Sequence, residues 1–117
     1  MLDLPLRFAG AARGWQGGGV AFVEPTPVPG ARTLARAWLL TREQVADVHA
    51  QEGAWYDLLL PCGELDGVEV VTITGSRRPP PDPNPPSAPY LSVVVRGLSV
   101  AHGWDPEEVR HHLSNSW

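Results

Sequence analysis

Glu52 is the residue of this sequence whose position most suggests chemistry. Val45, Val48 and Glu52 are separated by three and then four residues, so a helix would place all three on one face. A carboxylate on the core side of a helix loses water, and at the helix C-terminus it also meets the negative end of the dipole. Both effects raise a carboxyl pKa, as a general acid-base catalyst working near neutrality requires. Glu52 is therefore a candidate acid-base catalyst.

The same spacing allows a simpler interpretation of Glu52, as a charge in solvent. Gly53 follows directly and would end the helix in the left-handed conformation. Glu52 would then lie in the last turn, where its side chain reaches water. On spacing alone this solvated interpretation is favoured over a buried acid.

Three segments carry the start and stop signals of helices. They predict helices over about 42–51, from 88 to a stop at Gly103, and from 106 onward with Val109 and Leu113 as apolar residues. The signals are the capping-box pair Thr41 and Gln44, the N-cap candidates Ser87 and Asp105, the first-turn Pro106, and the terminal Gly53 and Gly103.

The other apolar segments are short runs broken by glycine and proline, which is typical of strands. We expect strands within residues 4–10, 17–25, 31–40, 55–61 and 68–75. Asp66-Gly67 lies between the last two and predicts a hairpin, because glycine accepts the positive φ of such turns. Strands first and helices mostly last predict one α+β domain over 1–117, a small mixed β-barrel or strongly curved sheet flanked by helices.

The segment "RRPPPDPNPPSAP", residues 77–89, is the densest part of the 13 prolines of this chain. Proline removes a backbone donor and fixes φ, so this segment can be neither a helix nor a central strand. We interpret it as an extended connection between two ordered parts. The alternative is a Pro-x-x-Pro ligand for a partner domain.

Composition and charge argue against several classes of function. A net charge of −4 without a basic patch disfavours a nucleic-acid partner. Cys62 is the single cysteine, so no internal disulfide framework exists, and no apolar run is long enough for a bilayer. The chain is expected to be cytoplasmic, with no membrane partner. No metal site is predicted, because the four histidines and Cys62 have no recognised ligand spacing.

Three stretches, in this order, resemble the γ-glutamylcyclotransferase-like family, particularly its small actinobacterial members: "ARAWLLTREQVADVHAQEG", "YDLLLPCGELDGVEVVTITG" and "PSAPYLSVVVRGLSVAHGWDPEEV". The likeness runs from about Leu6 to the C-terminus. It implies a small barrel flanked by helices and a reaction that needs no cofactor. In that reaction the free α-amine of a γ-glutamyl compound attacks its own γ-carbonyl and releases 5-oxoproline and an amine.

The resemblance also implies roles for individual residues. The family's essential glutamate matches Glu52, which would take a proton from the attacking ammonium and deliver one to the leaving amine. Tyr56 and Tyr90 match tyrosines that line or close the cavity and so would contact the γ-glutamyl substrate. The alternative for both is an ordinary core residue with its hydroxyl at the surface.

The sequence departs from the family at its N-terminus, where members have a strand and a Tyr-Gly-Ser-Asn type loop that holds the substrate. No such segment is present here. In "GWQGGGVAF", Gly18 and Gly19 are the candidates for a substitute backbone cradle, although a turn into a strand is the favoured interpretation.

Three explanations for the absent loop are open. An upstream start was missed, the chain is a catalytically degenerate relative that binds ligands or assembles, or a second subunit supplies the loop. Losing an edge strand would expose unpaired backbone groups. A homodimer would cover them.

Overall fold

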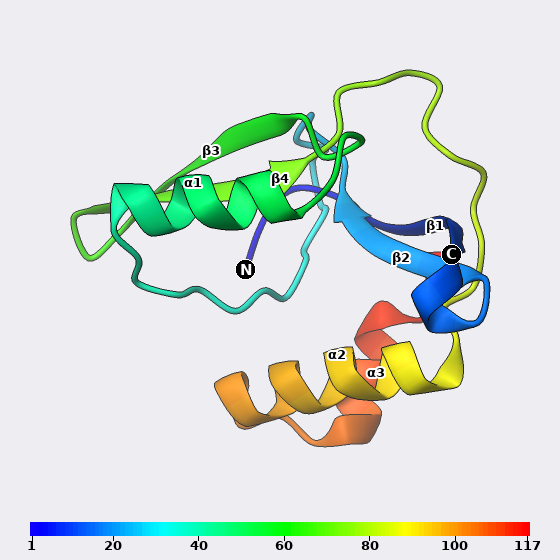
Figure 1. The fold of residues 1–117 in the computed structure, drawn as a ribbon. Helices are drawn as coiled ribbons and strands as arrows, with labels where there is room; N and C mark the ends of the chain where they lie inside the picture. The colour runs from blue at the N-terminus through cyan, green and yellow to red at the C-terminus, as the bar shows by residue number, and fades with distance from the viewer.

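The computed structural model describes residues 1–117, and its fold consists of three α-helices and two separate two-stranded antiparallel sheets (Figure 1). This confirms the predicted α+β class. The elements in chain order are β1 (Leu6–Ala12), the short 3-10 helix η1 (Arg13–Trp15), β2 (Gly18–Val23), α1 (Arg42–Gln51), β3 (Leu58–Leu65), β4 (Val68–Thr74), α2 (Ala88–His102) and α3 (Pro106–Leu113).

The helices begin and end where their capping residues predict. The Thr41 hydroxyl accepts from the Gln44 backbone N–H at 3.1 Å, and the Gln44 side chain accepts from the Thr41 N–H at 2.9 Å. The side chains of Ser87 and Asp105 cap α2 and α3 by accepting from the backbone N–H groups of Tyr90 and Glu107, and Gly103 ends α2 with φ 68°. No helix combines the length and apolar character needed to cross a bilayer.

The predicted barrel is wrong in its closure, because β1–β2 and β3–β4 do not join into one sheet. The outer edge of β1 is already occupied: the Phe8 N–H donates to the Ser116 carbonyl at 2.8 Å, and the Phe8 carbonyl accepts from Asn84 at 3.0 Å. The outer edge of β2 is bound by side chains, as described below. Neither edge is therefore available to another strand.

The predicted strand over 31–40 is also wrong. Only Thr33 makes a β-bridge, to Leu2, and residues 36–40 are all exposed. With both edges of the β1–β2 sheet occupied, this segment has no ladder to join. Residues 36–40 therefore remain in solvent, Leu39 with 85% of its surface exposed, whereas Leu34 is buried.

The proline-rich segment is a connection, as predicted, but it also packs on the β1–β2 hairpin. In Figure 1 it loops away from β4 and passes beside β1 and β2 before entering α2. The Gly10 N–H donates to the Asp82 carbonyl at 3.1 Å, and the Asn84 amide donates to the carbonyls of Gly10 at 2.7 Å and Gly17 at 2.9 Å. Asn84 therefore holds the turn end of the hairpin.

The apolar core lies where α2 and α3 meet the segment after β2. Its buried members are Leu34, Val95, Leu98, Val109 and Leu113. By contrast, α1 has no buried residue, and the β3–β4 hairpin is exposed over all of residues 63–69. The two halves of the molecule therefore differ in how much apolar surface they bury.

His112 ties α3 to this core through its unprotonated ring nitrogen. Nε2 accepts from the Leu34 backbone N–H at 3.0 Å, and burial, aided by the charge of Arg32, lowers the His112 pKa from 6.5. Because the folded-state pKa lies below the unfolded value, the unfolded chain binds a proton more readily. The contribution of His112 to the free energy of unfolding is complete above about pH 6.5, and it is lost as the pH falls through the lower pKa that His112 has in the folded state.

We therefore expect the free energy of unfolding, measured in urea, to fall between about pH 7 and pH 5. His112→Gln keeps an acceptor that does not titrate and should flatten this dependence. His111→Gln alters an exposed neighbour and serves as the control. An unchanged pH dependence in His112→Gln would contradict the assignment.

Candidate functional site

Tyr56 and Tyr90 meet at one residue of β2. The Ala21 N–H donates to the Tyr90 hydroxyl at 2.9 Å, and the Ala21 carbonyl accepts from the Tyr56 hydroxyl at 3.1 Å. Tyr90 comes from the first turn of α2, and Tyr56 from the segment before β3. The two tyrosines therefore satisfy backbone groups on the outer edge of β2.

The two hydroxyls have different roles, which follow from the chemistry of their partners. A carbonyl oxygen only accepts, so Tyr56 donates its proton to Ala21. A backbone N–H only donates, so Tyr90 accepts and keeps its own proton. The Tyr90 hydroxyl donates to no group of the chain. That proton is therefore available to a ligand.

Other groups complete the edge of β2. The Thr74 hydroxyl, at the end of β4, donates to the Val23 carbonyl at 2.5 Å, and the Gly19 N–H donates to the Pro85 carbonyl at 2.9 Å. Thr74 is fully buried and has this bond as its partner. The Thr74 hydroxyl thus connects the two sheets in place of a continuous ladder, and the Tyr56 hydroxyl ties the segment before β3 to β2.

Burial and local charge keep both tyrosines protonated. Burial raises the pKa of Tyr56 to about 12, with further contributions from Tyr90 and Glu52. Burial also raises the pKa of Tyr90, opposed by the Ala21 hydrogen bond and aided by the Glu52 charge. The Glu52 charge therefore acts on both hydroxyls, and its side chain makes no hydrogen bond to either.

Glu52 itself is exposed, at the C-cap of α1. Its backbone N–H donates to the His49 carbonyl at 3.2 Å, and Gly53 turns the chain with φ 83°. The expectation of a buried acid is wrong, because the face that carries Val48 does not cover a core. The solvated interpretation that spacing favours is the one observed.

The end of α1 is nevertheless held against Tyr56. The His49 Nε2–H donates to the Tyr56 carbonyl at 2.8 Å, because that oxygen only accepts. Trp55 packs its ring between Tyr56, at 5.0 Å between ring centroids, and Phe22, at 4.9 Å. The sequence predicts no such role for His49, because the contact depends on how the chain turns after α1 ends.

Gly18 and Gly19 face the chain itself. A Cβ on Gly18 would lie 2.5 Å from the Ser87 nitrogen, and one on Gly19 would collide with the Asn84 carbonyl oxygen. The Gly19 N–H is already bound to Pro85. Their lack of side chains thus permits the close approach of the proline-rich segment, and their predicted part in substrate binding stays a prediction.

Gly19→Ala is expected to destabilise the fold by about 1–3 kcal/mol, because the added methyl must displace backbone. Gly14→Ala is the matched control, since a Cβ there has no atom within 4 Å and Gly14 has no positive φ. Urea unfolding of both variants measures the difference. Equal stabilities would show that the proline-rich segment moves aside at no cost.

Among the predicted site residues, two side chains could take part in proton transfer. Glu52 offers an exposed carboxylate as a proton acceptor, and Tyr90 offers a half-buried phenol with a free proton. No three His, Cys, Asp or Glu side chains of the chain come together in a way that would hold a metal ion. Comparisons with protein-family models, curated proteins and solved structures find no match for this chain.

Proposed function

We propose that this chain is a γ-glutamylcyclotransferase-like enzyme that releases 5-oxoproline from a γ-glutamyl amine or amino acid. The observation that carries the proposal is the convergence of Tyr56 and Tyr90 on Ala21, with the Glu52 charge acting on both hydroxyls. The sequence resemblance supplies the reaction class. In this proposal the two open sheets correspond to the family's barrel, and the reaction takes place in the cytoplasm.

Glu52 acts as the proton carrier of this reaction. It removes a proton from the α-ammonium of the substrate, and the freed amine attacks the γ-carbonyl carbon to form the five-membered ring. The bond between the γ-carbon and the departing nitrogen breaks as Glu52 returns this proton to that nitrogen. The ring nitrogen then loses its second proton, which leaves with the released amine as an ammonium, so that 5-oxoproline keeps one N–H. Water is neither consumed nor formed.

Tyr90 donates to the carbonyl oxygen of the substrate as negative charge develops on it. Its proton is not used within the chain, and its raised pKa keeps it in the donor form at neutral pH. A preorganised donor of this kind typically contributes about 10²- to 10³-fold in rate. Tyr90 would thus supply part of the polarisation for which the family uses its N-terminal loop.

The proposal is tested by incubating the purified chain with a panel of γ-glutamyl amines and γ-glutamyl amino acids and measuring 5-oxoproline by chromatography. Release of 5-oxoproline and of the matching amine in equal amounts is expected. Glutamate in place of 5-oxoproline would indicate hydrolysis and a different reaction. No product from any member of the panel would overturn the enzyme proposal.

A second candidate function, a ligand-binding or assembly module, is favoured by the glycines. Since the Gly19 N–H is bound to Pro85, β2 offers no free amide cradle at that position. In this case γ-glutamyl amines bind without turnover, and Glu52→Gln leaves the affinity unchanged. Isothermal titration beside the product assay separates the two functions.

A further inference from the structure

The chain exposes more surface than a folded monomer of its size. Its accessible surface is 7736 Å², whereas the scaling of area with mass gives about 6,200 Å² for 12.7 kDa. The excess of about 1,500 Å² is of the order that one subunit contributes to an obligate interface of about 2,000–5,000 Å² in total. The molecule therefore has the spare surface of an assembled subunit.

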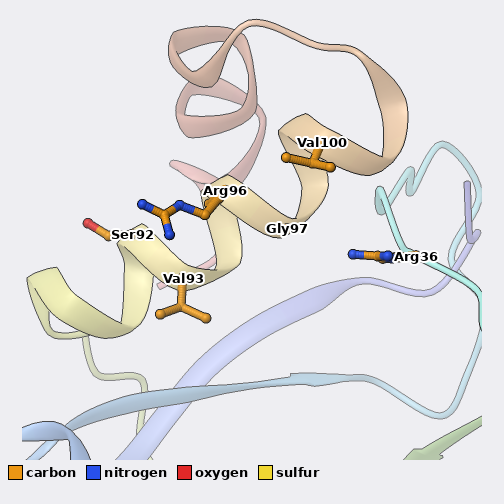
Figure 2. Close-up of a pocket in the computed structure, with 6 residues that line it drawn as sticks. All are labelled: Arg36, Ser92, Val93, Arg96, Gly97 and Val100. Atoms are coloured by element: carbon orange, nitrogen blue, oxygen red, sulfur yellow. The ribbon is translucent and has the colours of Figure 1, made fainter.

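A groove with an apolar wall and cationic sides lies along α2. Its volume is about 480 Å³, and Val93 and Val100 line it with 60% and 73% of their surfaces exposed. Figure 2 shows Arg36 on the loop across from α2 and Arg96 at the rim. The Arg36 guanidinium carbon lies 4.0 Å from the centre of the Trp38 ring, which orients it. Neither arginine has a carboxylate partner in the chain.

Gly97 lies between the two valines on the same face of α2. A glycine within a helix costs about 0.5–1 kcal/mol relative to alanine. A Cβ at this position would have no atom within 4 Å, so packing inside the chain does not require glycine here. The absence of a side chain leaves room for another backbone to approach α2 closely.

The turn between β3 and β4 has the complementary chemistry. Glu64 and Glu69 are directly opposite each other across the strands, and so are Leu65 and Val68, with 57% and 49% of their surfaces exposed. Like charges directly opposite are destabilising, and no cation of the chain pairs with these two. Because side chains alternate along a strand, the acidic pair and the apolar pair lie on opposite faces of the hairpin.

The two faces of this hairpin turn match the two sides of the groove. The apolar pair suits the valines of α2, and the acidic pair suits Arg36 and Arg96. Within one chain the turn and α2 lie apart, with the loop before α1 between them in Figure 1. The turn of the same chain therefore does not reach the groove, whereas the turn of a second copy could fill it.

We propose that two copies of this chain form a homodimer in which each inserts its β3–β4 turn into the α2 groove of the other. A two-fold axis repeats the contact, so each copy gives one turn and receives one. This assembly does not depend on the proposed enzyme activity. It also differs from a dimer through the β2 edge, which hydroxyl groups already occupy.

Charge reversal tests the contact. The groove variant Arg36→Glu/Arg96→Glu and the turn variant Glu64→Lys/Glu69→Lys should each dimerise at least about tenfold more weakly, since each brings like charges together. The turn variant keeps like charges opposite each other, as in the natural hairpin. Sedimentation velocity should give twice the 12.7 kDa chain mass for the unmodified protein and one chain mass for each variant at the same concentration.

Mixing the two variants is the decisive arm. Both contacts of the mixed dimer are again between opposite charges, so the equimolar mixture should regain the dimer although neither variant forms one alone. This rescue also shows that both variants are folded. Arg13→Glu reverses an exposed charge elsewhere and should leave the dimer unchanged. A monomer in the unmodified protein, or a mixture that stays monomeric, would overturn the proposal.

Gly97→Ala gives an independent test, because it should stabilise the monomer and weaken the dimer. The alanine should raise the melting temperature of the dilute monomer, because it favours the helix. It should weaken the dimer at least about tenfold, because the methyl occupies the surface against which the partner's backbone packs. A variant that is more stable and dimerises as well as the unmodified chain would contradict close approach at Gly97.

Discussion

Glu52→Gln is expected to lower the rate of 5-oxoproline release by about 10²- to 10⁴-fold. The amide has nearly the same shape as the carboxylate, but it takes up no proton from the substrate ammonium. Because Glu52 is exposed and its side chain makes no hydrogen bond within the chain, the fold should not change. The loss should therefore appear in kcat, with KM nearly constant.

Glu43→Gln is the matched control for this result. Glu43 is also an exposed glutamate of α1, in its first turn, at the other end of the helix from Tyr56. The same change of charge at that end should leave the rate unaltered. If both variants are as active as the unmodified chain, Glu52 has no part in the mechanism. If both lose the same amount of activity, the cause is a change in α1 and not in the site.

The tyrosines allow a further separation within the same assay. Tyr56→Phe and Tyr90→Phe each remove one hydrogen bond from Ala21, so their structural costs should be similar. Only Tyr90 keeps a proton for the substrate. Tyr90→Phe should thus lose about 10²-fold or more in kcat beyond the loss in Tyr56→Phe. Equal losses would assign both residues to the support of β2.

The helices were predictable from the sequence because their ends depend on nearby residues. Thr41 and Gln44 satisfy each other's backbone groups within one turn, and the side chains of Ser87 and Asp105 each accept from a backbone N–H two or three residues ahead. The Asp66-Gly67 turn is similarly local, with both residues at positive φ. Such signals fix an element without reference to the rest of the chain.

The sheet was not predictable in this way, because the pairing of an edge depends on residues far along the chain. The edge of β2 is bound by Tyr56, Tyr90 and Pro85. The two tyrosines are 35 and 69 residues away from Ala21, the residue they contact. A pattern of apolar residues predicts that a strand exists, but it does not show which groups reach its backbone. The expected barrel failed for this reason.

In the candidate site, too, local features were predictable from the sequence and long-range contacts were not. Spacing placed Glu52 at the end of α1, and it favoured the exposed position that is observed. The identification of Tyr56 and Tyr90 depended on a resemblance, since nothing in their spacing indicates that they share Ala21. The role of Asn84 in holding β1 and β2 was hidden in a proline-rich segment whose composition indicates only an extended chain.

Leu113→Ala should cost about 2–5 kcal/mol of unfolding free energy, the range for removing a buried leucine side chain. Leu113 is fully buried at the end of α3, in the cluster that joins α3 to α2 and to Leu34. These neighbours belong to three different parts of the chain, so they do not close together over the vacated volume. The loss is large beside the total of about 5–15 kcal/mol for a typical domain.

Leu39→Ala removes the same atoms from a leucine that is 85% exposed, so the two variants differ in burial and not in chemistry. Its cost should stay within about 0.5 kcal/mol. Urea unfolding under conditions that keep the chain monomeric measures both, and a shift in midpoint at constant slope identifies a change in stability. Because α1 and the β3–β4 hairpin bury so little, the helical core has to supply most of the stability. A small loss of unfolding free energy in Leu113→Ala would mean that this core does not supply most of the stability.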